Sequence, residues 1–286
     1  MPVFSGACSI IPCALCGQAK FKSVMECEGF SFVRCASCGL VQRNPQPDKN
    51  EIIARYTDTF GQDYLSYEIE NEKAFLNLQQ LAMHDADFPS VEEALFSKSA
   101  KTPAFLDVGC ATGALLESLA KPRRHSSHGW HVTGVEISPC AEYAREKRKL
   151  DVKSRALEEN EFAPRSFDVV HASHLVEHLN DPAGFMKEVF RILKDDGYFF
   201  LSTPNISGFQ ARLYRSRWRS AIFDHLYLFS RRTLIKMLKN TGFKIESCRT
   251  WGGLAAGMAP LWLKKTADSL AKRFNFGDVM IIRAVK

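Results

Sequence analysis

The sequence predicts an α/β fold built on a doubly wound, mostly parallel sheet. From residue 104 onward, short apolar runs rich in β-branched and aromatic residues alternate with stretches of helical periodicity. Parallel strands need a crossover, usually a helix, so this alternation indicates parallel pairing. The predicted strands are 104–108, 131–137, 167–173 and 197–204, the helices between them are 114–121, 139–150 and 181–194, and the strands 243–251 and 278–286 close the chain.

The chain ahead of this region divides into two parts of different character. Residues 1–45 are rich in cysteine and strand-like, whereas residues 46–102 carry apolar residues at helical spacing and are predicted to form a helical lid or linker. The third part is a domain over residues 103–286. Within it we expect a basic insert at about 205–240 and a helical segment at about 252–275.

Composition narrows the class of protein. The chain has 286 residues, 45% of them hydrophobic, which is enough for one large domain with a small accessory module. No run reaches the roughly 18 apolar residues that a membrane span needs, and the first residues lack the basic and apolar regions of a secretory signal. Nine cysteines are too few for a disulfide scaffold of this size, so we expect a reducing, cytoplasmic location.

Four of the cysteines have the spacing of a zinc ribbon. Cys13 and Cys16 form one Cys-x2-Cys pair and Cys35 and Cys38 form another, with 18 residues between the pairs. Two such knuckles can bring four thiolates to one tetrahedral Zn²⁺, and a glycine after each pair lets backbone N–H groups point at sulfur. Four thiolates leave no open coordination position, so the predicted site is structural. The alternative is four buried free cysteines.

A strand that ends in an acid and runs into a glycine turn predicts a ligand site. In residues 105–119 the strand ends near Asp107, and Gly109, Ala111 and Gly113 precede a helix. Glycine can adopt positive φ and lets a ligand approach the backbone, and the free N–H groups at the start of a helix suit an anion. A carboxylate at Asp107 would repel a pyrophosphate but suit an ammonium group. This favours the amino-acid end of S-adenosylmethionine over a dinucleotide.

Glu136 supplies a second acid. It ends the next predicted strand, 29 residues after Asp107, and an acid in that position can accept hydrogen bonds from both hydroxyls of a ribose. Alone, Glu136 could equally be an ordinary polar strand end. Together with the glycine turn, it predicts a nucleoside site shared by two carboxylates.

Residues 104–206 resemble a class I S-adenosylmethionine-dependent methyltransferase. The resemblance rests on the segments FLDVGCATG, GVEIS, RSFDVVHASHLVEHLNDP and DGYFFLSTPN. The later segment FDHLYLFS and the cysteine pairs extend it toward the small-molecule branch with an N-terminal zinc ribbon. It implies a Rossmann-like, seven-stranded sheet and methyl transfer from S-adenosylmethionine. These motifs are specific for the cofactor and poorly specific for the acceptor.

The resemblance also implies a set of cofactor contacts. The chain departs from the family pattern at Ala111, which replaces a middle glycine, and at Ala156, where many relatives have an Asp that contacts the adenine amino group. That contact would fall to backbone or to Glu158. The implied contacts are Asp107, Gly109, Cys110 and Gly113 at the methionine, Glu136 at the ribose, Ile137, Ala156 and Leu157 at the adenine, and Ser173 and His174 below the sulfonium.

Three histidines are candidate catalytic residues, because methyl transfer to oxygen or carbon can need a general base. They are His174, His178 and His225. His174, Glu177 and His178 have i, i+3 and i+4 spacing and could bind a metal, as in some catechol-type relatives, or could anchor the loop by hydrogen bonds. His225 could be a base or a hydrogen-bonded structural residue.

The helical segment adds three tyrosines, Tyr56, Tyr64 and Tyr67. The resemblance to methyltransferases with a zinc ribbon makes them candidates to cover the cofactor. The alternative is that they pack the segment against the larger domain.

Positive charge is concentrated in residues 205–276. This segment holds 14 Lys and Arg against three acidic residues, a net +11 in a chain whose total is +6. Arginine forks suit phosphate, and Trp218 in RLYRSRWRS could stack on a base or sugar. The pattern fits an anionic acceptor, and it also fits a solvated cationic face in peripheral contact with a membrane.

These observations predict an enzyme that methylates a small-molecule, sugar or lipid-precursor acceptor, which we expect to be anionic. One alternative is an RNA methyltransferase that uses the ribbon for recognition, although no Asn-Pro-Pro-Tyr-type motif follows the fourth strand. The other is a non-catalytic protein that binds the cofactor. The sequence identifies neither the acceptor nor the oligomeric state.

Overall fold

A computed structural model describes residues 8–98, 101–122, 128–252 and 261–286. Its centre is a seven-stranded sheet in the order β10-β11-β8-β7-β4-β5-β6, in which β11 runs antiparallel to both of its neighbours. The predicted mostly parallel, doubly wound sheet is therefore confirmed. The strands are β4 (Ala104–Val108), β5 (His131–Val135), β6 (Val152–Lys153), β7 (Phe167–Ser173), β8 (Leu193–Pro204), β10 (Lys244–Trp251) and β11 (Val279–Val285).

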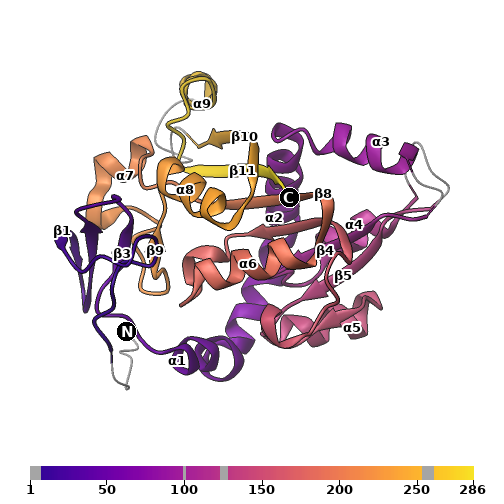
Figure 1. Ribbon diagram of the computed structural model, residues 1–286, viewed down its shortest axis with the longest axis horizontal. Helices are drawn as coiled ribbons and strands as arrows, with labels where there is room; N and C mark the ends of the chain where they lie inside the picture. Colours follow the sequence, from indigo (N-terminus) through magenta and orange to yellow (C-terminus); the bar gives the residue numbers. More distant parts are fainter. Residues whose placement is uncertain (1–7, 99–100, 123–127, 253–260) are drawn as a thin grey trace.

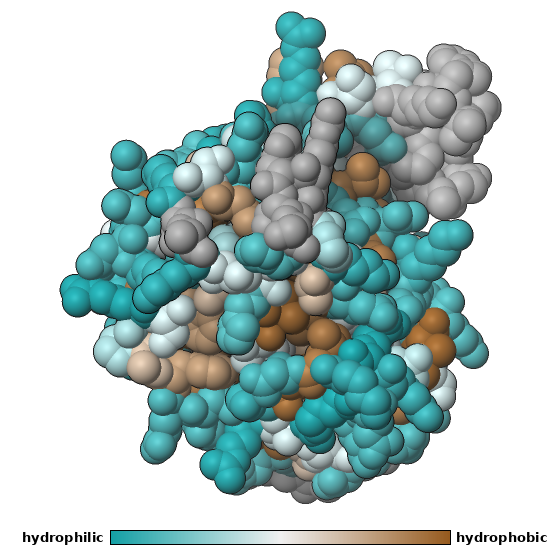
Figure 2. All heavy atoms as spheres, turned by 90° about the vertical axis from the view of Figure 1, so that its right-hand side faces the viewer, coloured by the Kyte–Doolittle hydropathy of each residue, from teal (hydrophilic) through white to brown (hydrophobic). Residues whose placement is uncertain are grey.

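Helices cover both faces of this sheet (Figure 1). Successive strand residues point to opposite faces, so Phe105 and Val169 pack beneath one layer of helices, and Leu106 and Val170 beneath the other. The first layer contains α2 (Gly61–Asp85), α3 (Phe88–Lys98), α4 (Ala114–Ala120) and α5 (Cys140–Arg148), and the second contains α6 (Pro182–Ile192) and α8 (Arg231–Thr241). The side of the molecule around α3 and α5 is largely hydrophilic (Figure 2).

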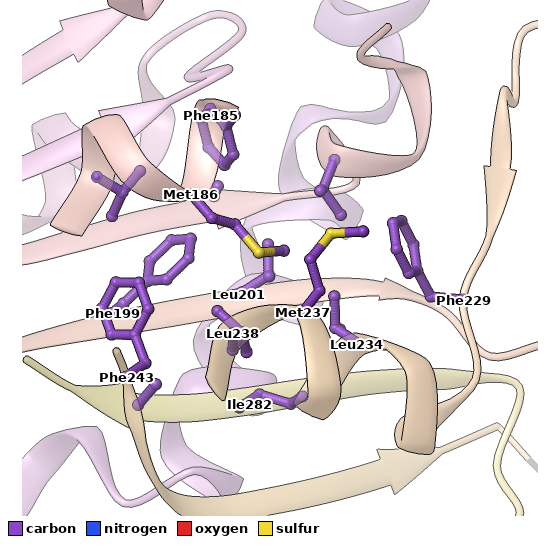
Figure 3. Packing of buried hydrophobic residues seen from close by; sticks show 14 of the residues in the cluster. Phe185, Met186, Phe199, Leu201, Phe229, Leu234, Met237, Leu238, Phe243 and Ile282 are labelled. Carbon is purple, nitrogen blue, oxygen red and sulfur yellow. The ribbon is translucent and has the colours of Figure 1, made fainter. Parts of the chain in front are cut away.

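The core under α6 and α8 is dense and apolar (Figure 3). Met186 of α6 and Met237 of α8 lie above Leu201 of β8 and Ile282 of β11, and all four are buried. Each such side chain contributes roughly 1.5–3 kcal/mol when it is removed from water. This packing holds β8 and β7 rigidly, and with them the carboxyl edge of the sheet.

The N-terminal module shares a second sheet with the larger domain. The sheet has the order β1-β2-β3-β9, and its last strand comes from the region after β8. Val41 and Gln42 pair antiparallel with Leu228 and Tyr227, and the Arg43 N–H donates to the carbonyl of residue 226 over 2.8 Å. The strands are β1 (Phe21–Cys27), β2 (Phe30–Cys35), β3 (Val41–Arg43) and β9 (Tyr227–Leu228).

The segment 46–102 is largely helical. Helix α1 (Lys49–Ala54) begins at Asp48, whose side chain accepts from the Glu51 N–H, and a π-helical turn (Arg55–Thr59) joins it to α2. No helix among the described residues is long and apolar enough to cross a membrane. The proposed domain boundaries stay a prediction.

In the basic region, the prediction that Trp218 could stack on a base or sugar is wrong. Trp218 follows α7 (Phe209–Tyr214), is only 2% exposed and donates its indole N–H to Asp278. It therefore cannot stack on a base or sugar at the surface. Helix α9 (Leu261–Phe274) covers the later part of the predicted helical segment, while residues 253–260 lie outside the described residues.

Candidate active site

Asp107 and Glu136 lie at the carboxyl ends of two adjacent parallel strands. Asp107 pairs with Gly134 across β4 and β5, so Glu136 projects two residues beyond it. Both side chains are buried. Glu136 Oε2 accepts from the Ala111 N–H (3.0 Å) and Oε1 accepts from the Ser138 N–H (2.8 Å). The carboxylate of Glu136 thus reaches the turn that follows Asp107.

The glycine turn has the backbone conformation that its sequence requires. Gly109 and Gly113 have φ of +75° and +77°, and a Cβ added at Gly113 would lie 2.6 Å from Leu150. Ala111 also has a positive φ, +46°, which costs an L-residue about 1 kcal/mol. The substitution of Ala for the usual glycine therefore stores backbone strain in the turn, as is common at binding sites.

Cys110 connects the two acids. Its thiol is buried, and burial, Asp107 and Glu136 all raise its pKa. The thiol is therefore neutral.

Asp107 has a partner that the sequence pattern does not predict. Its Oδ1 lies 2.7 Å from Nδ1 of His171, and the two side chains are 2% and 1% exposed. Asp107 and His171 are directly paired residues of β4 and β7. The contact depends on the register of the strands, which sequence alone does not reveal.

Helix α2 runs over the glycine turn. Thr112 donates its hydroxyl to Glu72 Oε2 (2.6 Å), and a Cβ added at Gly61 would lie 2.9 Å from Pro139. Burial, together with Glu136 and Glu72, raises the pKa of Glu68 to about 7. These contacts place α2 across the methionine end of the predicted cofactor site.

The three tyrosines of the helical segment divide into two groups. Tyr56 and Tyr64 pack edge to face with their ring centroids 5.7 Å apart, and burial raises the pKa of both phenols. Tyr67 is 53% exposed and contacts Phe75.

The adenine end of the predicted site is more open. A recess of about 350 Å³ is lined by β6 and the segment after it, residues 152–155 and 159–161, which flank Ala156 and Leu157 in the sequence. Ile137 and Ala156 are half-buried beside this edge, whereas the Leu157 side chain belongs to the core. Leu157 therefore offers only its backbone to a ligand.

His174 is the accessible member of the histidine group. It follows β7, its side chain is 48% exposed, and its φ is +52°. Its Nδ1 lies 3.3 Å from Oε1 of the buried Glu177. The neighbouring Ser173 shares a hydrogen bond of 2.7 Å with Ser202, and the next residue, Leu175, packs on Gly109. The loop that bears His174 thus contacts the glycine turn.

His178, which is half-buried, and the buried His225 form a cluster with the buried Glu177. One ligand atom of each lies within 4.8 Å of the others. Nδ1 of His178 lies 3.0 Å from the carbonyl of Asp224, and Nδ1 of His225 lies 2.8 Å from the carbonyl of Ser220. Because a carbonyl only accepts, Nδ1 of His225 carries the proton and its Nε2 is left with a lone pair. Nδ1 of His178 also lies 3.0 Å from the Tyr56 hydroxyl, which can donate or accept.

The charges of this cluster follow from its surroundings. Burial favours a raised pKa for Glu177, but the hydrogen bond and charge of His174 and the nearby histidines lower it to about 2. Burial lowers the pKa of His178, and lowers that of His225 to about 3. At neutral pH the cluster is an ionised carboxylate between two neutral imidazoles.

We expect this cluster to make the protein labile in acid. The folded pKa of His225 lies below the unfolded value of 6.5, so its contribution is present above pH 6.5 and is lost as pH falls toward 3. The pKa of Glu177 is lowered from 4.5 to about 2, so its contribution to stability is likewise lost as pH falls through this range. The free energy of unfolding should fall by up to about 1.4 kcal/mol per pH unit for each proton taken up. Chemical denaturation should show a shallower acid slope for His225→Asn between pH 6.5 and 4; an unchanged slope would contradict this assignment.

The four cysteines of the ribbon converge on one point. Their sulfur atoms all lie within 4.8 Å of one another, with Cys13 and Cys38 at 3.4 Å and Cys16 and Cys35 at 3.5 Å. Zn–S bonds of about 2.3 Å in a tetrahedron place sulfurs about 3.8 Å apart. The quartet is therefore compatible with a zinc ion.

The two knuckles have the local backbone that metal ribbons use. Gly17 and Gly39 have φ of +71° and +84° and donate to the carbonyls of Cys13 and Cys35 over 2.8 and 3.0 Å. Although burial opposes it, hydrogen bonds from backbone N–H groups lower the pKa of Cys35 to about 6. This favours the thiolate form at Cys35, whereas burial raises the pKa of Cys13 and Cys38.

Comparison with known proteins identifies the family. A sequence model described as a methyltransferase domain matches residues 77–248. The chain belongs to this family. A crystal structure of an S-adenosylmethionine-dependent methyltransferase from Archaeoglobus fulgidus has the same fold, with a TM-score of 0.51 and 18% identity over 77% of this chain and 99% of that one. The chain therefore contains a methyltransferase domain, and its fold is the one seen in that methyltransferase structure.

Two similar sequences are ubiquinone biosynthesis O-methyltransferases. The methyltransferase is 33% identical over 126 residues to that of Nitrosomonas europaea, covering 40% of this chain and 48% of the relative. It is 35% identical over 127 residues to that of Coxiella burnetii (strain Dugway 5J108-111), covering 42% and 51%. The chain thus spans about half the length of these curated relatives.

Proposed function

We propose that the methyltransferase methylates a hydroxyl oxygen of a small organic molecule, such as a sugar or lipid precursor. The observation that carries this proposal is His174, an exposed imidazole backed by the ionised Glu177, on the sheet edge that also bears Asp107 and Glu136. An O-methyltransferase needs a base at this place, where the acceptor hydroxyl loses its proton. The names of the two relatives agree with this chemistry.

The residues of the glycine turn would hold the cofactor. Asp107 would accept from the α-amino group, and Gly109, Cys110 and Gly113 would let the methionine approach the backbone. A carboxylate has about four acceptor positions, so Glu136 can bind ribose hydroxyls while it keeps the Ala111 and Ser138 N–H groups. The bound cofactor supplies an activated methyl group on a sulfonium, and the chain then has to align the acceptor with it.

His174 is the proposed general base. Its Nδ1 lies 3.3 Å from Glu177 Oε1, so a proton on Nδ1 would be stabilised by the carboxylate and Nε2 would take the acceptor proton. His225 is buried and His178 is half-buried, and the Nδ1 atom of each lies within hydrogen-bond distance of a backbone carbonyl in the 220–226 segment. They would act as positioning residues that fix this segment, while Thr203 donates its hydroxyl to Glu177 Oε2 (2.9 Å).

The proposed acceptor carries negative charge. Arg212, Arg215 and Arg217 are exposed on α7 and the turn after it, within the segment of net +11. Arginines suit carboxylates and phosphates because their N–H groups bind in pairs. The burial of Trp218 excludes this side chain as a stacking surface for a base or sugar of the acceptor.

The experiment is a release assay for S-adenosylhomocysteine with pairs of hydroxyl compounds. Each pair consists of a phenol or sugar and its carboxylated or phosphorylated counterpart, and mass spectrometry locates the added methyl group. We expect methyl ethers, formed faster from the anionic member of a pair. Methylation of nitrogen or sulfur alone would contradict the proposal, as would RNA as the only acceptor.

Replacing His174 with alanine should lower kcat by about 10²- to 10⁴-fold, because the proposed base is removed. The KM for S-adenosylmethionine should change little, since Asp107 and Glu136 remain. The matched control is His131→Ala. His131 is an exposed histidine at the amino end of β5, away from the carboxyl edge of the sheet that bears His174. A kcat close to that of the wild type across pH 6 to 9 would exclude His174 as the base.

We infer that the ribbon holds a structural Zn²⁺. Cys13, Cys16, Cys35 and Cys38 offer four sulfurs at suitable separations, and Zn²⁺ prefers such sites. Four thiolates would complete the coordination of the ion, so it would support the fold and take no part in methyl transfer.

A further inference from the structure

We propose that His171 is a positioning residue that aims the Asp107 carboxylate at the amino-acid end of the cofactor. This inference rests on the proposed role of Asp107. It adds a residue outside the motifs on which the cofactor site was predicted.

The geometry of the pair is well defined. Asp107 and His171 are partners across β4 and β7, and their side chains share the face of the sheet that also bears Phe105. His171 Nδ1 lies 2.7 Å from Asp107 Oδ1, and the backbone neighbour of His171 on its other side is Phe200 of β8. An imidazole enclosed between aromatic residues and three strands has little freedom to turn away.

The contact fixes the orientation of the Asp107 carboxylate. An Nδ1–H of His171 takes one acceptor position of Oδ1, and the positions that remain, those of Oδ2 above all, can accept from an ammonium group at the strand end. Among the described residues, His171 is the one side chain that hydrogen-bonds Asp107. Its removal would leave a buried carboxylate without a partner, which is costly. Such a carboxylate would turn toward water or bind a proton, and either change would weaken its hold on an ammonium group.

Two ligands that differ only at the amino-acid end isolate this effect. S-adenosylhomocysteine carries the amino and carboxylate groups, whereas 5′-methylthioadenosine keeps the adenosine and the sulfur but lacks them. Only the first can contact Asp107. A general loss of structure would weaken both ligands, while misplacement of Asp107 would weaken only S-adenosylhomocysteine.

The test is calorimetric titration of the full chain with both ligands. His171→Leu should weaken S-adenosylhomocysteine by about tenfold or more and leave 5′-methylthioadenosine unchanged. His171→Asn should restore the affinity, because its amide N–H can take the place of Nδ1–H. His171→Phe keeps the ring volume without the donor, and is the variant to use if leucine lowers the folded yield.

A double-mutant cycle adds a second readout. If His171 acts through Asp107, combining His171→Leu with Asp107→Ala should weaken S-adenosylhomocysteine no more than Asp107→Ala alone. Equal losses for both ligands would overturn the inference, as would no loss for either or additive effects in the cycle. A wild-type chain that binds neither ligand would instead refute the proposed cofactor site itself, and the role of His171 with it.

Discussion

Asp107→Ala will weaken the binding of S-adenosylhomocysteine by about a hundredfold. The change removes a hydrogen bond between charged groups, for which about 2–3 kcal/mol is typical, at a site that is 2% exposed. Glu136→Ala should have an effect of similar size, because it removes the acceptor of the ribose hydroxyls and also frees the Ala111 N–H. Calorimetric titration measures both losses directly.

Asp168→Asn is the matched control for these variants. Asp168 is also a carboxylate of the central sheet, but it lies at the amino end of β7, where it accepts from the Ala104 N–H and from Lys194. Its replacement should lower the thermal stability and leave the affinity for S-adenosylhomocysteine intact. If Asp168→Asn weakened the ligand as much as Asp107→Ala did, the effect of Asp107 would be one of stability and not of contact.

Cys38→Ser should abolish binding of the proposed Zn²⁺ and disturb a region far from residue 38 in sequence. The loss should lower the midpoint of thermal unfolding by about 10 °C, equivalent to roughly 4 kcal/mol in a domain of this size. Because β3 pairs with β9, residues 222–229 should also lose protection from hydrogen exchange. Metal analysis, thermal unfolding and hydrogen exchange together test the prediction.

Loss of the ribbon should affect residues 222–229 because the ribbon contacts the segment that bears His225. Arg43 of β3 donates to the Phe223 carbonyl (2.8 Å) and lies over the Phe223 ring at 4.5 Å. Asp224, the next residue, pairs with Arg55 and accepts from His178. Loss of the ribbon should therefore lower kcat through the histidine cluster.

Cys27→Ser is the control, since Cys27 lies in β1 outside the quartet. It should keep one ion per chain and the protection of residues 222–229. A Cys38→Ser protein with unchanged metal content would contradict the zinc assignment. Loss of the ion with unchanged exchange in residues 222–229 would contradict the coupling.

Much of the fold was predictable because its signals are local. The alternation of apolar strands with helices predicted the central sheet, and the Gly109 to Gly113 spacing predicted the turn beside Asp107. The two Cys-x2-Cys pairs predicted the quartet in the same way. Each of these patterns either lies within a few residues or consists of residues at a fixed spacing.

The features that were missed depend on contacts between distant segments. The His171–Asp107 contact is set by strand register, and β9 is a strand of two residues that exists only because β3 pairs with it. Trp218 has the local sequence of an exposed basic segment, yet Asp278, 60 residues later, supplies the partner that buries its indole. Sequence periodicity carries no information on such pairs.

A crystal structure with S-adenosylhomocysteine tests the central claim most directly. We expect its amino group beside Asp107 and its ribose hydroxyls on Glu136, with the adenine toward the recess after β6. A ligand bound elsewhere, or one that touches neither carboxylate, would contradict the assignment of this pocket.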